Sequence, residues 1–248
     1  MPHMDSASAK GSYDHRRGQI ETYFDRTAAE AWSRLTSDAP VNGIRKTVRE
    51  GRDRMRATLL DWLPADLTGK RILDAGCGTG ALAREAASRG AEVVAIDVAL
   101  TLVDLARDRS TEAFGIQPAG RAGTGRIDYR VGDMLDPALG HFDHVVAMDS
   151  LIHYRTADMV SMLARLAERT GTSIVFTFAP GTPALSLMLA VGRLFPRQDR
   201  APAIEPVDAG ALRQHLTAEP ALSAWRPGRD LRVSGGFYKS HAMELTRA

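Results

Sequence analysis

The stretch Arg71-Ile-Leu-Asp-Ala-Gly-Cys-Gly-Thr-Gly80 decides the expected fold. Ile72 and Leu73 end a short apolar run that is typical of a buried strand, and three glycines follow at alternate positions. The next segment, Ala81-Leu-Ala-Arg-Glu-Ala-Ala87, consists mainly of strong helix formers. The order of strand, glycine loop and helix predicts the first half of a β-α-β unit, in which the backbone comes close to a ligand.

A second apolar strand strengthens this interpretation. Glu92-Val-Val-Ala-Ile-Asp97 ends in an acid about twenty residues further on, where a β-α-β unit places a carboxylate against ribose hydroxyls. The glycine spacing is not G-x-G-x-x-G, and a glycine loop by itself is weak evidence. Asp74-Ala-Gly-Cys-Gly-Thr-Gly80 followed by Asp97 resembles motifs one and two of the class I S-adenosylmethionine-dependent methyltransferases.

Composition limits the classes of protein to consider. A chain of 248 residues with 44% hydrophobic and 25% charged residues fits one globular α/β domain, and a net charge of +2 gives no nucleic-acid signature. The single cysteine, Cys77, cannot form an internal disulfide, which fits a reducing cytoplasmic setting. We expect Cys77 to be a small side chain beneath a cofactor, and the alternative is a nucleophile. We expect no signal peptide and no membrane-spanning helix.

Patterning predicts a three-part organisation. We expect a disordered tail at 1–15, a helical N-terminal cap at 16–66 and a methyltransferase domain at 67–248, with a lid segment at 180–206. Five strands alternate with helices before a terminal hairpin; they are expected at 71–74, 92–97, 127–131, 143–149 and 172–178. The resemblance then implies an α/β, Rossmann-like class I methyltransferase fold: a seven-stranded, mostly parallel sheet with an antiparallel edge hairpin and a lid inserted after the fifth strand.

The cap includes a predicted helix at 44–63 with two different faces. Apolar residues recur on one stripe, whereas the other side carries a net positive charge from six basic residues against Glu50 and Asp53. This positive side is a solvated helix face or, alternatively, a surface that attracts an anionic substrate, an anionic membrane or an acidic partner.

The carboxyl ends of the predicted strands supply candidates for binding S-adenosylmethionine. The methionine part is assigned to the glycine loop and its preceding acid, the ribose to Asp97 and its neighbour, the adenine to the loop after the third strand, and the transferable methyl to the end of the fourth. The candidates in that order are Asp74, Gly76, Cys77, Gly78 and Gly80; Asp97 and Val98; Asp133 and Met134; and Asp149. A simple turn residue remains the alternative for Asp133.

Four stretches together are more selective than the glycine loop. They resemble the magnesium-protoporphyrin IX O-methyltransferase family along nearly all of the chain: Tyr23-Phe24 with Trp32 and Arg34 ahead of Val41-Asn42; Ile72 to Gly80; Asp149-Ser-Leu-Ile-His-Tyr154; and Phe178-Ala-Pro-Gly-Thr182 leading to Leu194-Phe-Pro196.

The resemblance implies methylation of a propionate of magnesium protoporphyrin IX, with magnesium present only as part of the substrate. Tyr23 and His153 match the family's catalytic tyrosine and histidine. The substrate-binding residues that we expect are Phe24, Trp32, Arg34, Tyr154, Leu187, Arg193 and Phe195. The family also suggests contact with the magnesium chelatase large subunit, and an apolar and basic lid suggests peripheral contact with the photosynthetic membrane.

The chemistry agrees with modest roles for the two catalytic candidates. A propionate has a pKa of about 4.3 and is ionised at neutral pH, so His153 and Tyr23 are expected to orient it. A loop histidine is often only a surface residue, which is the alternative for His153. The sequence after the fourth strand lacks the proline and aromatic pattern of base methylation, and the histidines show no ligand set for a protein-bound metal. The alternative functions are methylation of a quinone or phenol and non-catalytic carriage of a porphyrin or cofactor.

Overall fold

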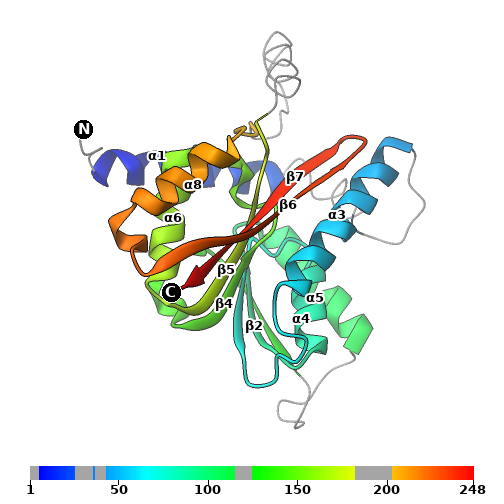
Figure 1. Cartoon of the computed structure of the whole chain (residues 1–248). Coiled ribbons are helices and arrows are strands. Elements are labelled where there is room, and N and C mark those ends of the chain that lie inside the picture. The colour runs from blue at the N-terminus through cyan, green and yellow to red at the C-terminus, as the bar shows by residue number, and fades with distance from the viewer. Residues whose placement is uncertain (1–5, 26–35, 37–42, 115–124, 182–202) are drawn as a thin grey trace.

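The structure, a computed structural model, describes residues 6–25, 36, 43–114, 125–181 and 203–248. Within these ranges the chain forms one seven-stranded sheet in the order β3-β2-β1-β4-β5-β7-β6 (Figure 1). Its strands are β1 (Arg71–Ala75), β2 (Glu92–Asp97), β3 (Arg126–Val131), β4 (Phe142–Ala147), β5 (Thr170–Phe178), β6 (Trp225–Gly235) and β7 (Tyr238–Arg247). β1 to β5 are parallel, and β7 pairs antiparallel with β5 and β6. The predicted parallel sheet with an antiparallel edge hairpin is confirmed.

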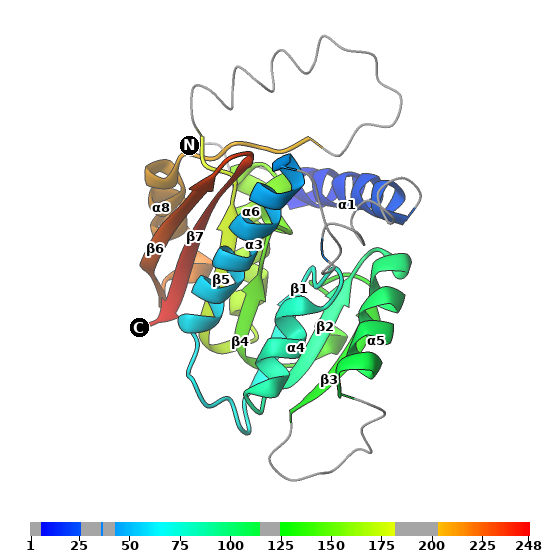
Figure 2. The same cartoon turned by 90° about the vertical axis from the view of Figure 1, so that its right-hand side faces the viewer.

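Helices cover both faces of the sheet (Figure 2). One face carries α3 (Gly43–Asp61), α4 (Ala81–Ser88) and α5 (Leu100–Phe114), and the other carries α1 (Ser6–Tyr23), α6 (Thr156–Ala167) and α8 (Ala209–Ala218). Short 3-10 turns occur at η2 (Pro137–Leu139), η3 (Leu151–His153) and η4 (Pro220–Leu222). The sheet is therefore the middle of three layers.

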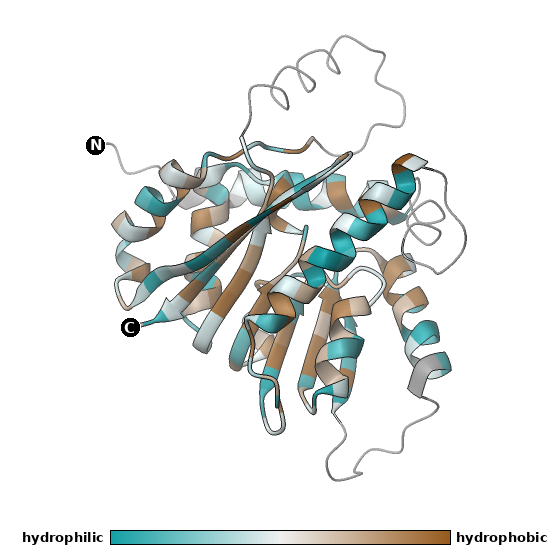
Figure 3. Ribbon diagram, turned by 45° about the vertical axis from the view of Figure 1, so that its right-hand side comes forward, coloured by the Kyte–Doolittle hydropathy of each residue, from teal (hydrophilic) through white to brown (hydrophobic). Residues whose placement is uncertain are grey.

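The strands supply a separate core to each face because successive side chains point in opposite directions. In β1, Ile72 packs into the cluster under α3, α4 and α5, whereas Leu73 packs into the cluster under α1, α6 and α8. In β2, Val93 and Val94 divide in the same way. The continuous apolar runs of these central strands, brown in Figure 3, follow from burial on both sides.

Helix α3 crosses the terminal hairpin and is held close to it by two glycines. A side chain at Gly51 would come within 2.5 Å of the Tyr238 ring, and one at Gly236 would come within 2.5 Å of the Thr47 hydroxyl. Gly236 also has a φ of 52°, which disfavours other residues. Close contact fixes α3 against β7 and so places its polar side chains relative to the sheet.

The expectation of a disordered tail at 1–15 is wrong for residues 6–15, which begin α1. Tyr13 and Ile20, two helical turns apart, are buried in the core beside α6, with only 6% and 8% of their surfaces exposed. Burial of these two side chains stabilises a helix that is otherwise polar.

The expected end of the fourth strand is also wrong by two residues. β4 ends at Ala147, and Asp149 follows it with a φ of 55°, a backbone conformation that cannot continue a strand. Most of the expected lid, 180–206, lies outside the described residues; at its ends Pro180 bridges to Val207. No helix within the described ranges is long and apolar enough to cross a membrane.

Candidate active site

A cavity of about 690 Å³ opens at the carboxyl ends of β1, β2 and β4, between α1, α3 and the glycine loop. Eleven of the residues predicted from the sequence line it: Phe24, Asp74, Gly76, Cys77, Gly78, Asp97, Val98, Met134, Asp149, His153 and Tyr154. The parallel sheet brings these distant segments together because its strands all end at the same edge.

The glycine loop has the backbone geometry expected of a ligand cradle. Gly76, Gly78 and Gly80 have φ values of 85°, 52° and 73°, which other residues rarely adopt. A side chain at Gly76 would collide with Ser150, and one at Gly80 would collide with Tyr129. Gly80 precedes α4 and does not line the cavity, so its role is close packing of helix and strand, whereas Gly76 and Gly78 face the site.

Two acids lie beneath this loop, the buried Asp74 and the partly buried Asp97. Asp97 accepts hydrogen bonds from the backbone N–H groups of Gly78 (2.9 Å) and Ala99 (3.0 Å), which fixes its carboxylate. Asp74 is 1% exposed, and its Oδ2 atom has no hydrogen-bond partner within the part of the chain that is described. Burial, together with the charge of Asp97, raises the pKa of Asp74 to about 7.

These two acids fit the groups of S-adenosylmethionine. The unsatisfied oxygen of Asp74 is suited to a cationic amino group, and the anchored carboxylate of Asp97 is suited to ribose hydroxyls. A buried acceptor without a partner is costly, and a bound cation would remove that cost. The residues present therefore fit the predicted cofactor.

Asp133 has a different environment from the one expected. Its carboxylate accepts a 2.5 Å hydrogen bond from the hydroxyl of Tyr13 on α1 and lies 3.6 Å from the Arg17 guanidinium. The neighbouring Gly132 and Met134 line the cavity, and so does Tyr13. Asp133 thus anchors α1, and its contact with the adenine stays a prediction.

Tyr13 is a site residue that sequence reasoning missed. Its ring stacks on that of Tyr154, with centroids 5.5 Å apart, so α1 and the loop after β4 form one aromatic wall. Burial and the hydrogen bond to Asp133 raise the pKa of Tyr13 far above its usual value, so the phenol stays protonated and donates. The spacing of Tyr13 and Ile20 at i and i+7 was the available signal.

Asp149 is held by side chains from three elements. Its carboxylate pairs with Arg52 of α3 at 2.5 Å and accepts from Tyr238 (3.1 Å) and Ser240 (3.3 Å) of β7. Thr177 of β5 donates to it at 3.2 Å and accepts from its backbone N–H. These contacts compensate for the unusual backbone conformation and fix Asp149 at the cavity wall.

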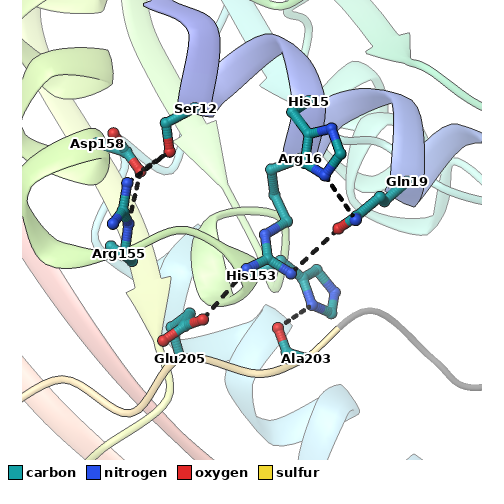
Figure 4. A network of polar contacts seen from close by, with 9 residues as sticks. All are labelled: Ser12, His15, Arg16, Gln19, His153, Arg155, Asp158, Ala203 and Glu205. Atoms are coloured by element: carbon teal, nitrogen blue, oxygen red, sulfur yellow. Dashed lines mark hydrogen bonds and ion pairs between the residues drawn. The ribbon is translucent and has the colours of Figure 1, made fainter. Parts of the chain in front are cut away.

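His153 belongs to a polar network that joins α1 to the segment before α8 (Figure 4). A ring nitrogen of His153 lies 3.3 Å from the Ala203 carbonyl oxygen, and Arg16 of α1 pairs with Glu205 at 3.2 Å. Nearby, Ser12 donates to Asp158 at 3.0 Å. His153 is only 8% exposed and lines the cavity, which disfavours the alternative of a plain surface histidine.

The comparison with known proteins decides the family. The chain is 47% identical to the magnesium-protoporphyrin O-methyltransferase of Rhodobacter capsulatus over 237 residues, which cover 94% of this chain and 97% of that one. The chain belongs to the magnesium-protoporphyrin O-methyltransferase family. The Synechocystis magnesium-protoporphyrin O-methyltransferase is 30% identical, with 92% of this chain and 95% of that one covered.

Family models and solved structures agree with this membership. Residues 147–247 match the magnesium-protoporphyrin IX methyltransferase C-terminus, and residues 72–171 match a methyltransferase domain. The crystal structure of the Synechocystis magnesium protoporphyrin IX methyltransferase with bound S-adenosylhomocysteine superimposes with a TM-score of 0.77 at 27% identity, covering 92% of this chain and 98% of that one. The class I fold and S-adenosylmethionine as the cofactor, both predicted from the sequence, are confirmed.

The structure does not place the other predicted site residues of this magnesium-protoporphyrin O-methyltransferase family member in the cavity. Tyr23 ends α1 and stacks edge-on against Phe24 at 5.1 Å, and it is not among the described residues that line the cavity. Its catalytic role stays a prediction. Trp32, Arg34, Leu187, Arg193 and Phe195 lie outside the described residues. Among the described residues, no group of three or more His, Cys, Asp or Glu side chains could hold a metal ion.

Proposed function

We propose that this chain transfers a methyl group from S-adenosylmethionine to one propionate carboxylate of magnesium protoporphyrin IX, giving the monomethyl ester of (bacterio)chlorophyll biosynthesis. The observation that carries the proposal is the 47% identity, over 94% of the chain, to the Rhodobacter capsulatus magnesium-protoporphyrin O-methyltransferase. The cavity supports it, because donor-side acids and acceptor-side residues line the same space.

The chain's donor-side residues would bind and orient the cofactor. Asp74 would receive the amino group and Asp97 the ribose hydroxyls, while Gly76 and Gly78 leave room for the backbone to approach. When bound, S-adenosylmethionine supplies an electrophilic methyl group on a sulfonium: the acceptor oxygen forms a C–O bond as the C–S bond breaks, and S-adenosylhomocysteine leaves.

On the acceptor side, positioning matters more than proton removal. A propionate is already ionised at neutral pH, so no base has to activate it. His153, held near Ala203, would orient the carboxylate by a hydrogen bond, and the stacked rings of Tyr13 and Tyr154 would contact the flat macrocycle. Phe24 would extend the same apolar wall.

A phenol or quinol acceptor is the second candidate. The ubiquinone biosynthesis O-methyltransferase of Xanthomonas oryzae is 34% identical, covering 73% of this chain and 72% of that one. A phenol, with a pKa of about 10, would need a base, and His153 is the described cavity residue suited to that task.

Two associations follow as separate proposals. Family membership supports contact with the magnesium chelatase large subunit, which would deliver the porphyrin; a pull-down without association would contradict it. Exposed Ile44 at the start of α3 and exposed Phe237 in the β6–β7 turn support peripheral contact with an anionic membrane. Equal sedimentation with anionic and zwitterionic vesicles would contradict the membrane proposal.

The test uses the full chain with S-adenosylmethionine and, separately, magnesium protoporphyrin IX and a quinol acceptor. We expect the porphyrin to be esterified and the quinol to remain unmodified. His153→Ala should keep affinity for S-adenosylhomocysteine and slow transfer, whereas the control His141→Gln, at an exposed position, should leave both unchanged. Bound cofactor without an ester product would overturn the proposal.

A further inference from the structure

Helix α3 turns a polar stripe toward the cavity. Arg49, Arg52, Asp53 and Arg56 all line it, at positions i, i+3, i+4 and i+7, which share one face of an α-helix. The apolar residues Met55, Leu59 and Leu60 of the same helix are buried in the core instead. The positive charge of α3 therefore belongs to the cavity wall and not to a solvated surface alone.

The charges of the cavity are arranged for two different ligands. The buried Asp74 and the partly buried Asp97 lie at the end assigned to the cationic cofactor. At the α3 side, the stripe and Asp149 together contain three arginines and two carboxylates among the described lining residues. Because charges interact more strongly in a partly desolvated cavity than in water, this side favours an anionic acceptor.

Two arginines of the stripe are held by ion pairs before any acceptor binds: Arg52 with Asp149, and Arg56 with Asp53 at 2.9 Å. Arg52 is 19% exposed and pairs with Asp149, which the donors on β5 and β7 hold in turn. The contact of Gly51 with the Tyr238 ring fixes the height of this helical turn above β7. A guanidinium has five N–H donors in a rigid fork, so Arg52 can serve Asp149 and a second carboxylate together.

We infer that this stripe, through Arg49 and Arg52, binds the carboxylate of the acceptor that does not react; the inference rests on the proposed function. Magnesium protoporphyrin IX carries two propionates. An ion pair at the reacting carboxylate would stabilise its ionised ground state and weaken its attack on the methyl group. At the other carboxylate, the same ion pair fixes the macrocycle without that loss, because its charge does not change during transfer.

This arrangement explains why transfer would stop after one ester. Each transfer converts an anionic carboxylate into a neutral ester, as the carboxylate oxygen takes the methyl group and the C–S bond breaks. A monoester that rebinds the other way round presents its ester to α3, where it has no charge for Arg49 and Arg52 to bind. The stripe thus selects acceptors with two ionised carboxylates.

The test compares two acceptors, magnesium protoporphyrin IX and a matched magnesium porphyrin in which an ethyl group replaces one propionate. We expect wild-type kcat/KM to be about tenfold higher for the diacid, the ratio that one charge-assisted hydrogen bond supplies. Arg49→Gln should raise KM for the diacid and bring this ratio close to one. Arg52→Lys, whose ammonium group lacks the fork that serves two carboxylates, should lower the ratio. Arg52→Lys retains the positive charge beside Asp149 and so keeps the fold, and Arg45→Gln on the exposed side of α3 is the control.

The outcomes separate this inference from the function on which it rests. Affinity for S-adenosylhomocysteine should be the same in all variants, and the two cavity variants should form some dimethyl ester. An unchanged ratio of diacid to monoacid in both variants would overturn the inference while leaving the proposed function intact. If wild-type protein binds S-adenosylhomocysteine but methylates neither porphyrin, the proposed function fails, and the inference fails with it.

Discussion

The guanidinium of Arg52 on α3 lies 2.5 Å from the carboxylate of Asp149, two residues past β4, and this ion pair joins the N-terminal cap to the sheet edge. The two residues are 97 positions apart, and only 8% of the Asp149 side chain is exposed. The pair connects the acceptor side of the cavity to the hairpin through Tyr238 and Ser240.

The Arg52–Asp149 pair should show strong coupling in a double-mutant cycle. With Arg52→Gln, Asp149→Asn and the double variant, we expect a coupling energy of about 1–3 kcal/mol in urea unfolding, because both groups are largely buried. The exposed pair Arg126–Glu92 is the control and should give less than about 1 kcal/mol. Equal coupling energies for the two pairs would contradict the role given to the buried one.

Gly51 should be intolerant of substitution. Gly51→Ala adds a methyl group 2.5 Å from the Tyr238 ring, and the resulting overpacking should lower the free energy of unfolding by about 1–3 kcal/mol. Gly18→Ala in α1 meets no atom within 4 Å and should leave stability unchanged or raise it by up to about 1 kcal/mol. Similar Tm changes for both variants would show that α3 is not pressed against β7.

Binding of S-adenosylhomocysteine should release a proton from Asp74. With its pKa raised to about 7, the buried carboxyl holds a proton at pH 6, and the incoming amino group favours the ionised form. Calorimetry at pH 6 in buffers of different ionisation enthalpy should detect this proton, and Asp74→Asn should lose it. A binding enthalpy that does not depend on the buffer in the wild-type protein would contradict this assignment.

The raised pKa of Asp74 also makes the folding stability depend on pH. Between pH about 4 and about 7 the folded chain retains a proton at Asp74 that the unfolded chain has released. The contribution of this group to the free energy of unfolding therefore falls as the pH rises through that window and is constant above it. Asp74→Asn should flatten this part of the stability profile, measured by urea unfolding; a profile unchanged by the substitution would exclude this contribution.

Tyr13 should hold α1 in place through its hydroxyl. Tyr13→Phe removes the hydrogen bond to Asp133 and should lower the free energy of unfolding by about 1 kcal/mol, because Asp133 is partly exposed. Trypsin cleavage after Arg16 and Arg17, followed by mass spectrometry, should become faster. Thr22→Ser, at an exposed position of the same helix, should leave the cleavage rate unchanged. Equal cleavage rates in wild-type and Tyr13→Phe protein would show that the Tyr13 hydroxyl does not hold α1 in place.

The strands, and the gathering of the cofactor-binding candidates at one edge of the sheet, were predictable because the sequence signals were local. The apolar runs before Asp74 and Asp97 and the alternating glycines place these residues at one sheet edge, and the structure brings them to one cavity. Parallel strands make that inference possible, since their carboxyl ends always lie on the same side.

The contacts between distant segments could not be predicted. Arg52 and Asp149 each look ordinary in the sequence, and their pairing depends on how α3 lies across the hairpin. Tyr13 occurs in a polar stretch whose helix is stabilised by tertiary burial, and Asp133 turns toward Tyr13 for the same reason. Tertiary contacts of this kind leave weak local patterns, so a structure was needed to find them.

A single-turnover experiment can follow methyl transfer to a porphyrin carboxylate in the cavity. Protein preloaded with S-adenosylmethionine labelled in the transferable methyl group is mixed with magnesium protoporphyrin IX, quenched and hydrolysed under mild alkali. We expect one labelled methyl per porphyrin, all of it released as methanol, which identifies an ester. Label that resists alkali, or no labelled porphyrin despite bound cofactor, would contradict methyl transfer to a carboxylate.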